Sequence, residues 1–199
     1  MHESPTLPRP LVLGSTSRYR RELLSRLNLP FDVAAPEVDE TPHDREPPKE
    51  LALRLALAKA RAVAALRPTA VVIGSDQVAD LAGRPLGKPG NHEKATQQLQ
   101  AMSGQTVIFQ TAVAVVCAET GFEQVDLAPV EVKFRPLSSA EIERYLRAEE
   151  PYDCAGSAKS EGLGISRLDA ILSDDPTALI GLPLIRTCRM LRAAGLVLP

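Results

Sequence analysis

Small, hydroxyl-bearing residues followed by arginines mark the first place in the chain where chemistry is expected. Residues 14–17 read Gly-Ser-Thr-Ser and precede Arg20 and Arg21 at the start of an expected helix over residues 18–27. A helix N-terminus offers free N–H groups and partial positive charge, and arginine binds phosphate oxygens in a bidentate way. Taken alone, the segment is better explained by Ser17 capping the helix beside solvated arginines.

Carboxylates in two separate segments form the second group. Asp76 follows the apolar run 71–75, and Glu40 lies in an acidic loop with Glu37 and Asp39. Carboxylate oxygens suit a hard divalent cation such as magnesium or manganese. The alternatives are that Asp76 forms a turn and that the acidic loop is merely solvated.

Two lysines have the charge needed to complement these acids or a phosphate. Lys59 shares a helical face with apolar residues of segment 49–67, and Lys88 lies in a glycine- and proline-rich loop over residues 81–90. A lysine within an apolar stripe either extends its charged end to solvent or meets a carboxylate or phosphate. Both readings of Lys59 stay open.

Histidine and cysteine chemistry is not expected. The three histidines lie in polar segments and are interpreted as solvated. The three cysteines are far apart and lack Cys-x-x-Cys spacing, which fits a reducing cytoplasm. Cys154 has no histidine base in its segment, so we expect a small buried side chain and not a nucleophile.

The elements that must position these residues alternate along the chain. We expect strands over 11–13, 71–76, 107–116 and 125–134, and helices over 18–27, 49–67, 92–102, 138–147 and 183–194. The last two strands flank Gly121 and predict an antiparallel pair. The pattern indicates an α/β fold, a mixed sheet flanked by helices, with no prediction of strand order.

Overall composition bounds the class of protein. With 199 residues, 44% apolar and 24% charged, the chain is expected to form one core over residues 11–199, after a flexible tail over residues 1–10. A net charge of -2 argues against a nucleic-acid partner. The sequence contains no apolar run long enough for a membrane span, so we expect a cytoplasmic protein.

Six motifs occur in order along the chain: GSTSRYRR (14–21), APEVDET (35–41), AKA (58–60), IGSDQV (73–78), GKP (87–89) and AGSAKSEG (155–162). Through them the chain resembles the Maf family of nucleotide pyrophosphatases from about Leu11 to Leu196. The resemblance implies an elongated mixed sheet with two lobes around a cleft, a fold related to the inosine triphosphate pyrophosphatases. It also implies hydrolysis of a nucleoside triphosphate between the α and β phosphates, giving a monophosphate and pyrophosphate.

The family's functional residues carry over position by position. Asp76 matches the catalytic aspartate, and whether it acts as the base or as a metal ligand stays open. This chain departs from the family at Arg18, where proline is usual. The other matches are Ser15 and Arg20 for phosphate binding, Glu40 for a Mg²⁺ or Mn²⁺ ion, and Lys59 and Lys88 as essential lysines.

Residues 154–162 resemble the branch of the family that acts on 7-methyl-GTP. Tyr19, Gln77 and Glu161 stand where the dTTP and UTP branch has arginine, threonine and glutamine. An aromatic ring and a carboxylate suit a cationic methylated guanine. Related enzymes usually have tryptophan at Tyr19, so stacking should be weaker here.

Two other functions are compatible with these residues. A pyrophosphatase for another modified or pyrimidine nucleotide would share every catalytic residue. A non-catalytic nucleotide-binding regulator of cell division would not need both a metal site and a base, so Glu40, Lys59, Asp76 and Lys88 together argue against it. A homodimer would be unsurprising.

Overall fold

A seven-stranded mixed sheet forms the centre of the protein. The computed structural model describes residues 7–157 and 159–198. The strand order is β2-β1-β3-β5-β6-β7, with β4 added to the side of β3, and only β2, β1 and β3 run parallel. The predicted mixed sheet and its antiparallel pair are confirmed. The strands are β1 (Leu11–Gly14), β2 (Asp32–Ala34), β3 (Val71–Leu81), β4 (Arg84–Leu86), β5 (Thr106–Cys117), β6 (Phe122–Phe134) and β7 (Leu168–Leu172).

Five α-helices and three short 3-10 helices surround the sheet in the described residues. Ser138 and Glu141 form the expected capping box at the start of α4. Gly195 follows the last helix with φ +89°, a conformation in which glycine pays little steric cost. The α-helices are α1 (Arg18–Ser25), α2 (Pro48–Leu66), α3 (His92–Met102), α4 (Ser139–Glu149) and α5 (Leu184–Ala193), and the 3-10 helices are η1 (Ala155–Ser157), η2 (Leu163–Arg167) and η3 (Ala178–Ile180).

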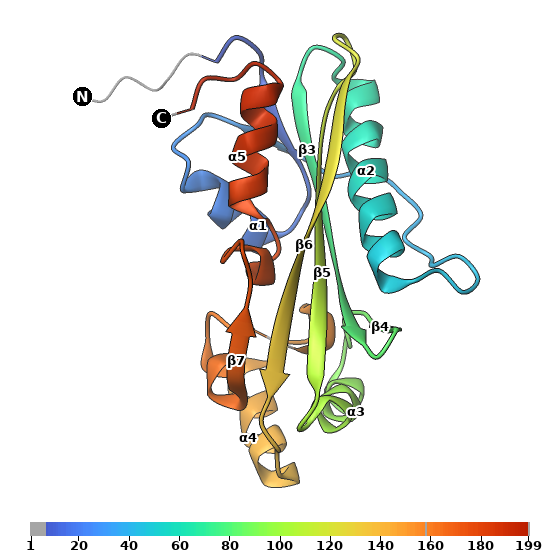
Figure 1. The fold of residues 1–199 in the computed structure, drawn as a ribbon, viewed down its shortest axis with the longest axis vertical. Coiled ribbons are helices and arrows are strands. Elements are labelled where there is room, and N and C mark those ends of the chain that lie inside the picture. Colours follow the sequence, from blue (N-terminus) through green and yellow to red (C-terminus); the bar gives the residue numbers. More distant parts are fainter. Residues whose placement is uncertain (1–6, 158, 199) are drawn as a thin grey trace.

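The helices divide the molecule into two lobes along the long strands (Figure 1). In one lobe, α2 covers one face of the sheet and α1 with α5 covers the other, each over its own apolar core. In the second lobe, α3 and α4 pack on the far ends of β5 and β6. Because β3 and β5 contribute side chains to the cores of both lobes, the strands themselves hold the lobes together.

Strand β3 differs from the prediction in a way that matters for function. We expected the strand to end at Asp76, but β3 continues to Leu81 and pairs with β5 beyond that point. Asp76 lies opposite Ala112 in the middle of the strand. The run Ser75-Asp76-Gln77 interrupts the apolar pattern because the strand passes between the lobes there, and not because it ends.

Three smaller differences have local causes. The loop expected over residues 81–90 contains β4, which forms a hairpin with β3 around Gly83, where φ is +81°. Strands β2 and β7 were not predicted, because both are short and half exposed. Helix α1 ends at Ser25, two residues before the predicted end.

Most of the predicted N-terminal tail, residues 1–6, lies outside the described residues. Of the remainder, Leu7 packs against the core beneath α1 and α5, and Arg9 forms an ion pair with Glu119. The prediction of a single domain over residues 11–199 stays a prediction. None of the helices in the described chain has the length and apolar character needed to cross a membrane.

Candidate active site

A cleft of about 790 Å³ lies where the two lobes meet. Its walls come from the β1–α1 turn, the loop before α2, the middle of β3, the loop before α3, and segments around residues 154, 161 and 180. All nine residues predicted from the sequence line it: Ser15, Tyr19, Arg20, Glu40, Lys59, Asp76, Gln77, Lys88 and Glu161.

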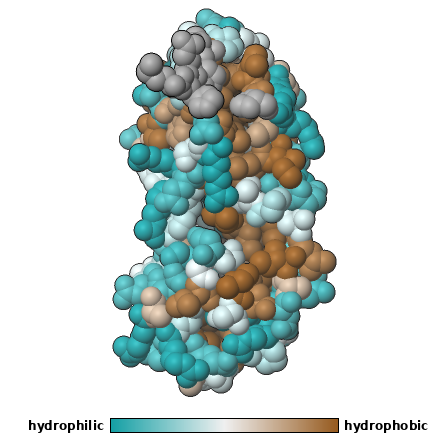
Figure 2. Space-filling view, turned by 90° about the vertical axis from the view of Figure 1, so that its left-hand side faces the viewer, coloured by the Kyte–Doolittle hydropathy of each residue, from teal (hydrophilic) through white to brown (hydrophobic). Residues whose placement is uncertain are grey.

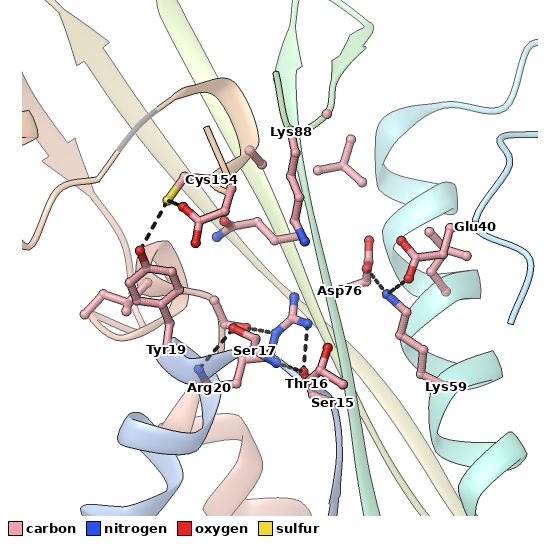
Figure 3. Close-up of a pocket in the computed structure, with 18 of the residues that line it drawn as sticks. Ser15, Thr16, Ser17, Tyr19, Arg20, Glu40, Lys59, Asp76, Lys88 and Cys154 are labelled. Carbon is pink, nitrogen blue, oxygen red and sulfur yellow. Dashed lines mark hydrogen bonds and ion pairs between the residues drawn. The ribbon is translucent and has the colours of Figure 1, made fainter. Parts of the chain in front are cut away.

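Lys59 lies between two carboxylates on the α2 side of the cleft (Figure 3). Its Nζ atom is 2.7 Å from Asp76 Oδ1 and 2.7 Å from Glu40 Oε1. Lys59 is 5% exposed and Asp76 is 7% exposed. Of the two readings left open by the sequence, the structure therefore selects contact with carboxylates and excludes extension into solvent.

The close approach of α2 to β3 brings these groups together. A Cβ atom at Gly74 would lie 2.3 Å from the Ala56 carbonyl oxygen and 2.5 Å from the Ala60 nitrogen. No real side chain fits in that space, so glycine lets the helix rest directly on the strand. Lys59 on the helix and Asp76 on the strand consequently meet across this contact.

The β1–α1 turn forms the anion-binding end of the cleft. Ser15 Oγ accepts hydrogen bonds from the Ser17 N–H (3.2 Å) and from Arg20 Nη1 (3.4 Å). Ser17 caps α1, as expected, but Arg20 lines the cleft and is not simply solvated. Burial lowers the pKa of the Arg20 guanidinium, and the charges of Asp76 and Glu40 oppose this shift. Arg21 is exposed and lies outside the cleft lining.

Positive charge dominates the field around Glu40. Burial acts to raise the pKa of its carboxyl, but the hydrogen bond and charge of Lys59, with the charges of Lys88 and Arg20, hold that pKa below its usual value. Lys88 extends from its loop toward the middle of the cleft (Figure 3). A site with three cations near two carboxylates suits a polyphosphate more than a neutral ligand.

Residues 178–181, which we call the back segment, complete the cleft and were missed by the sequence reasoning. The Gly181 carbonyl accepts hydrogen bonds from Arg20 Nε (2.9 Å) and from Ser75 Oγ (3.0 Å). Gln77 Nε2 donates to the carbonyls of Ala178 and Leu179, both at 3.0 Å. Because backbone carbonyls accept these hydrogen bonds, the side-chain types of the back segment do not indicate its place in the cleft.

Tyr19 and Cys154 both line the cleft and are joined by a weak hydrogen bond. The Cys154 Sγ atom lies 3.8 Å from the Tyr19 hydroxyl oxygen. Burial, with the charge of Asp153, raises the pKa of the Cys154 thiol to about 12. The thiol is therefore neutral at physiological pH. The expectation of a buried side chain was wrong, because Cys154 is half-buried and lines the cleft.

Arg18 adds a cation beside the Tyr19 ring. Its Cζ atom lies 4.7 Å from the ring centroid, and its Nη2 atom donates to the tyrosine hydroxyl at 2.7 Å. The Arg18 side chain is 66% exposed, so it can move when a ligand arrives. The sequence flagged this position only as a departure from the family pattern.

Glu40 and Asp76 fit a divalent cation that takes its remaining ligands from substrate. Among the described residues no group of three or more His, Cys, Asp or Glu side chains forms a complete metal cage. Magnesium is commonly held by one or two carboxylates together with phosphate oxygens and water. Two carboxylate oxygens that approach the same lysine nitrogen, in a cleft suited to phosphates, meet that requirement.

Comparison with known proteins places this arrangement in a family. A protein from Albidiferax ferrireducens named 7-methyl-GTP pyrophosphatase is 69% identical over 97% of both chains. A protein of the same name from a Polaromonas species is 72% identical over 96% of this chain and 87% of its own. A HAM1 protein structure from Coxiella burnetii matches 63% of this chain and 73% of its own with a TM-score of 0.42 and 15% identity. The family model described as Maf-like protein matches residues 10–194, and the chain therefore belongs to the Maf family.

Proposed function

We propose that this protein hydrolyses nucleoside triphosphates between the α and β phosphates and that 7-methyl-GTP is its preferred substrate. The products are then 7-methyl-GMP and pyrophosphate. The observation that carries the reaction type is the contact of buried Lys59 with buried Asp76 and with the more exposed Glu40 inside a cation-lined cleft. The names of relatives that are 69% and 72% identical support the substrate.

The triphosphate binds across the anion-binding end of the cleft. Ser15 and the free N–H groups at the start of α1 contact phosphate oxygens, and Arg20 adds a guanidinium whose direction is fixed by the Gly181 carbonyl. Lys59 and Lys88 neutralise negative charge that develops on the leaving pyrophosphate. Hydrogen-bond donors held in a fixed arrangement in a partly enclosed cleft stabilise negative charge more strongly than the same groups do in water.

Asp76 is the carboxylate placed to activate water. The water oxygen bonds to the α-phosphorus, the bond from that phosphorus to the bridging oxygen breaks, and pyrophosphate leaves with the electron pair. Asp76 accepts the water proton, while Lys59 keeps the carboxylate oriented through its 2.7 Å contact. A Mg²⁺ or Mn²⁺ ion held by Glu40 and Asp76 would supply additional neutralisation of phosphate charge.

The base is recognised beside the phosphate-binding turn, by Tyr19 of α1 and by Glu161. N7-methylation makes guanine cationic and makes N1 more acidic, so the carboxylate of Glu161 gains a charge-assisted hydrogen bond from the base edge. Tyr19 stacks on the base and adds about 1 kcal/mol. Gln77 is held by the back segment and acts as a fixed wall beside the base.

A substrate panel tests this proposal. Pyrophosphate release is measured with 7-methyl-GTP, GTP, dTTP and UTP, with and without a chelator, for wild type and for Glu161→Gln. We expect the highest kcat/KM for 7-methyl-GTP, loss of activity with chelator, and loss of most of the preference in the variant. Preference for dTTP or UTP would refute the substrate, and nucleotide binding without turnover would instead support a regulatory role.

A further inference from the structure

The loop that carries Glu161 is anchored by a residue outside the cleft. We define the Glu161 loop as residues 159–163. Glu149, the last residue of α4, accepts a hydrogen bond from the Leu163 N–H through Oε2 at 2.8 Å. Its Oε1 atom forms an ion pair with Lys159 Nζ. One carboxylate therefore holds the loop on both sides of Glu161.

Two glycines lie where the Glu161 loop packs closely. A Cβ atom at Gly164 would lie 2.2 Å from the Lys159 carbonyl oxygen, a backbone atom, so this position requires glycine. A Cβ atom at Gly162 would lie 2.7 Å from Glu149 Oε2, so a larger residue there would displace the Glu149 carboxylate. Neither glycine has a positive φ angle, so close packing and not backbone conformation matters at both positions.

A buried arginine, Arg167, also acts on the Glu149 carboxylate through its charge. Arg167 is 2% exposed, and its Cζ atom lies 3.6 Å from the centroid of the Tyr145 ring. Within the described residues its side-chain nitrogens have no hydrogen-bond partner. Its charge reinforces the hydrogen bonds from Lys159 and Leu163, which together hold the pKa of Glu149 below its usual value. Glu149 thus stays ionised although its side chain is only 11% exposed.

We infer that Glu149 is a positioning residue for recognition of the nucleobase. It does not line the cleft, whereas Glu161 does. By fixing the Glu161 loop from outside, Glu149 holds the Glu161 carboxylate in the direction of the base and lowers the ordering cost of binding. Lys159, which lies in the motif 155–162, serves this anchor through its ion pair with Glu149. The inference rests on the proposed role of Glu161.

Glu149→Gln tests the inference because it keeps the shape of the side chain and removes its charge. KM and kcat are measured for 7-methyl-GTP and GTP. We expect KM for 7-methyl-GTP to rise about tenfold, the loss associated with a charge-assisted hydrogen bond. We expect kcat to change less than about twofold, since the reacting groups are untouched. The preference over GTP should fall accordingly.

The matched control is Glu150→Gln, which changes an exposed neighbour whose side chain has no hydrogen bond or ion pair among the described residues. Its kinetics should equal those of wild type. Lys159→Met should reproduce part of the Glu149→Gln effect, and the double variant should be less impaired than the two single effects combined, because they remove the same ion pair. Hydrogen exchange at the Leu163 amide should be faster in Glu149→Gln.

Two results would overturn the inference. One is a Glu149→Gln variant with unchanged KM and unchanged exchange at Leu163. The other is an equal loss of kcat for both nucleotides together with a lower Tm, which would indicate only a structural role. A wild-type enzyme that does not prefer 7-methyl-GTP would instead refute the proposed substrate. The effect of Glu149→Gln on the KM of the nucleotide that is hydrolysed, and on Leu163 exchange, would still decide the role of Glu149.

Discussion

At the scale of single residues, the two lysines of the cleft play different structural parts. Lys59 is buried and bound to two carboxylates, whereas Lys88 is exposed and reaches the cleft from a loop. Removing Lys59 therefore leaves Asp76 as a buried carboxylate without its partner. Removing Lys88 leaves no buried charge unpaired. We propose that both lysines act in catalysis, but we expect the removal of each to affect folding differently.

Lys59→Met and Lys88→Met separate these effects. Both variants should lose activity about 100-fold, because each removes a cation that stabilises charge on the phosphates. Only Lys59→Met should lower the free energy of unfolding substantially, by about 3 kcal/mol. Lys88→Met should stay within about 0.5 kcal/mol of wild type. Urea denaturation and steady-state kinetics measure the two quantities, and a stable Lys59→Met enzyme with normal turnover would contradict the account.

At the scale of elements, the site depends on how α2 lies on β3. Gly74 is the point of contact, and the strand continues through Asp76 to Leu81 instead of ending at the site. Asp76 thus lies in a stretch of β3 that pairs with β5 both before and after it. A residue in the middle of a paired strand is held more rigidly than one in a loop, which suits a group that must keep its orientation.

Gly74→Ala should disturb this contact more than the addition of one methyl group would suggest. The new Cβ would meet backbone atoms of α2 at 2.3 and 2.5 Å, and backbone cannot move aside as a side chain can. We expect a loss of stability of about 1–3 kcal/mol and a fall in kcat/KM as Lys59 shifts from Asp76. Gly87→Ala, where no atom lies within 4 Å of the new Cβ, is the control for stability. Equal stability of the two variants would show that the contact is not tight.

Sequence periodicity predicted the long helices well and the irregular segments poorly. The bounds of α3 match the prediction, and the capping box of α4 was visible in Ser138 and Glu141. The length of β3 was missed because a polar run inside a strand looks like a strand end. The 3-10 segments η1, η2 and η3 have no periodic signal, because contacts distant in sequence hold them in place.

At the scale of the whole molecule, function arises where two lobes share strands. Residues from 15 to 181 converge on one cleft because β3 and β5 run through both cores. The cleft residues that the sequence predicted were identified by their residue types and by the family motifs. The groups that orient them, the Gly181 carbonyl and the Glu149 carboxylate, were not found. A backbone carbonyl has no sequence signature, and Glu149 becomes informative only when folding brings α4 to the Glu161 loop.

The surface of the two-lobed molecule carries apolar and polar regions on the face that includes β7 (Figure 2). Ile171 and Leu172 of β7 and Leu163 and Ile165 of η2 are among its exposed apolar residues. These side chains lie outside the cleft lining. The cleft lining likewise combines charged and apolar residues.

Pyrophosphate release from 7-methyl-GTP by wild type and by Asp76→Asn tests the central claim most directly. Asparagine keeps the size of the side chain and an acceptor for Lys59, but it loses the charge needed to accept a proton or bind a metal ion. Asp80→Asn, on the same strand but outside the cleft lining, is the control. We predict that wild type and Asp80→Asn release pyrophosphate and that Asp76→Asn, still folded by circular dichroism, loses at least about 100-fold in kcat. A folded Asp76→Asn protein with near-normal turnover would contradict the account.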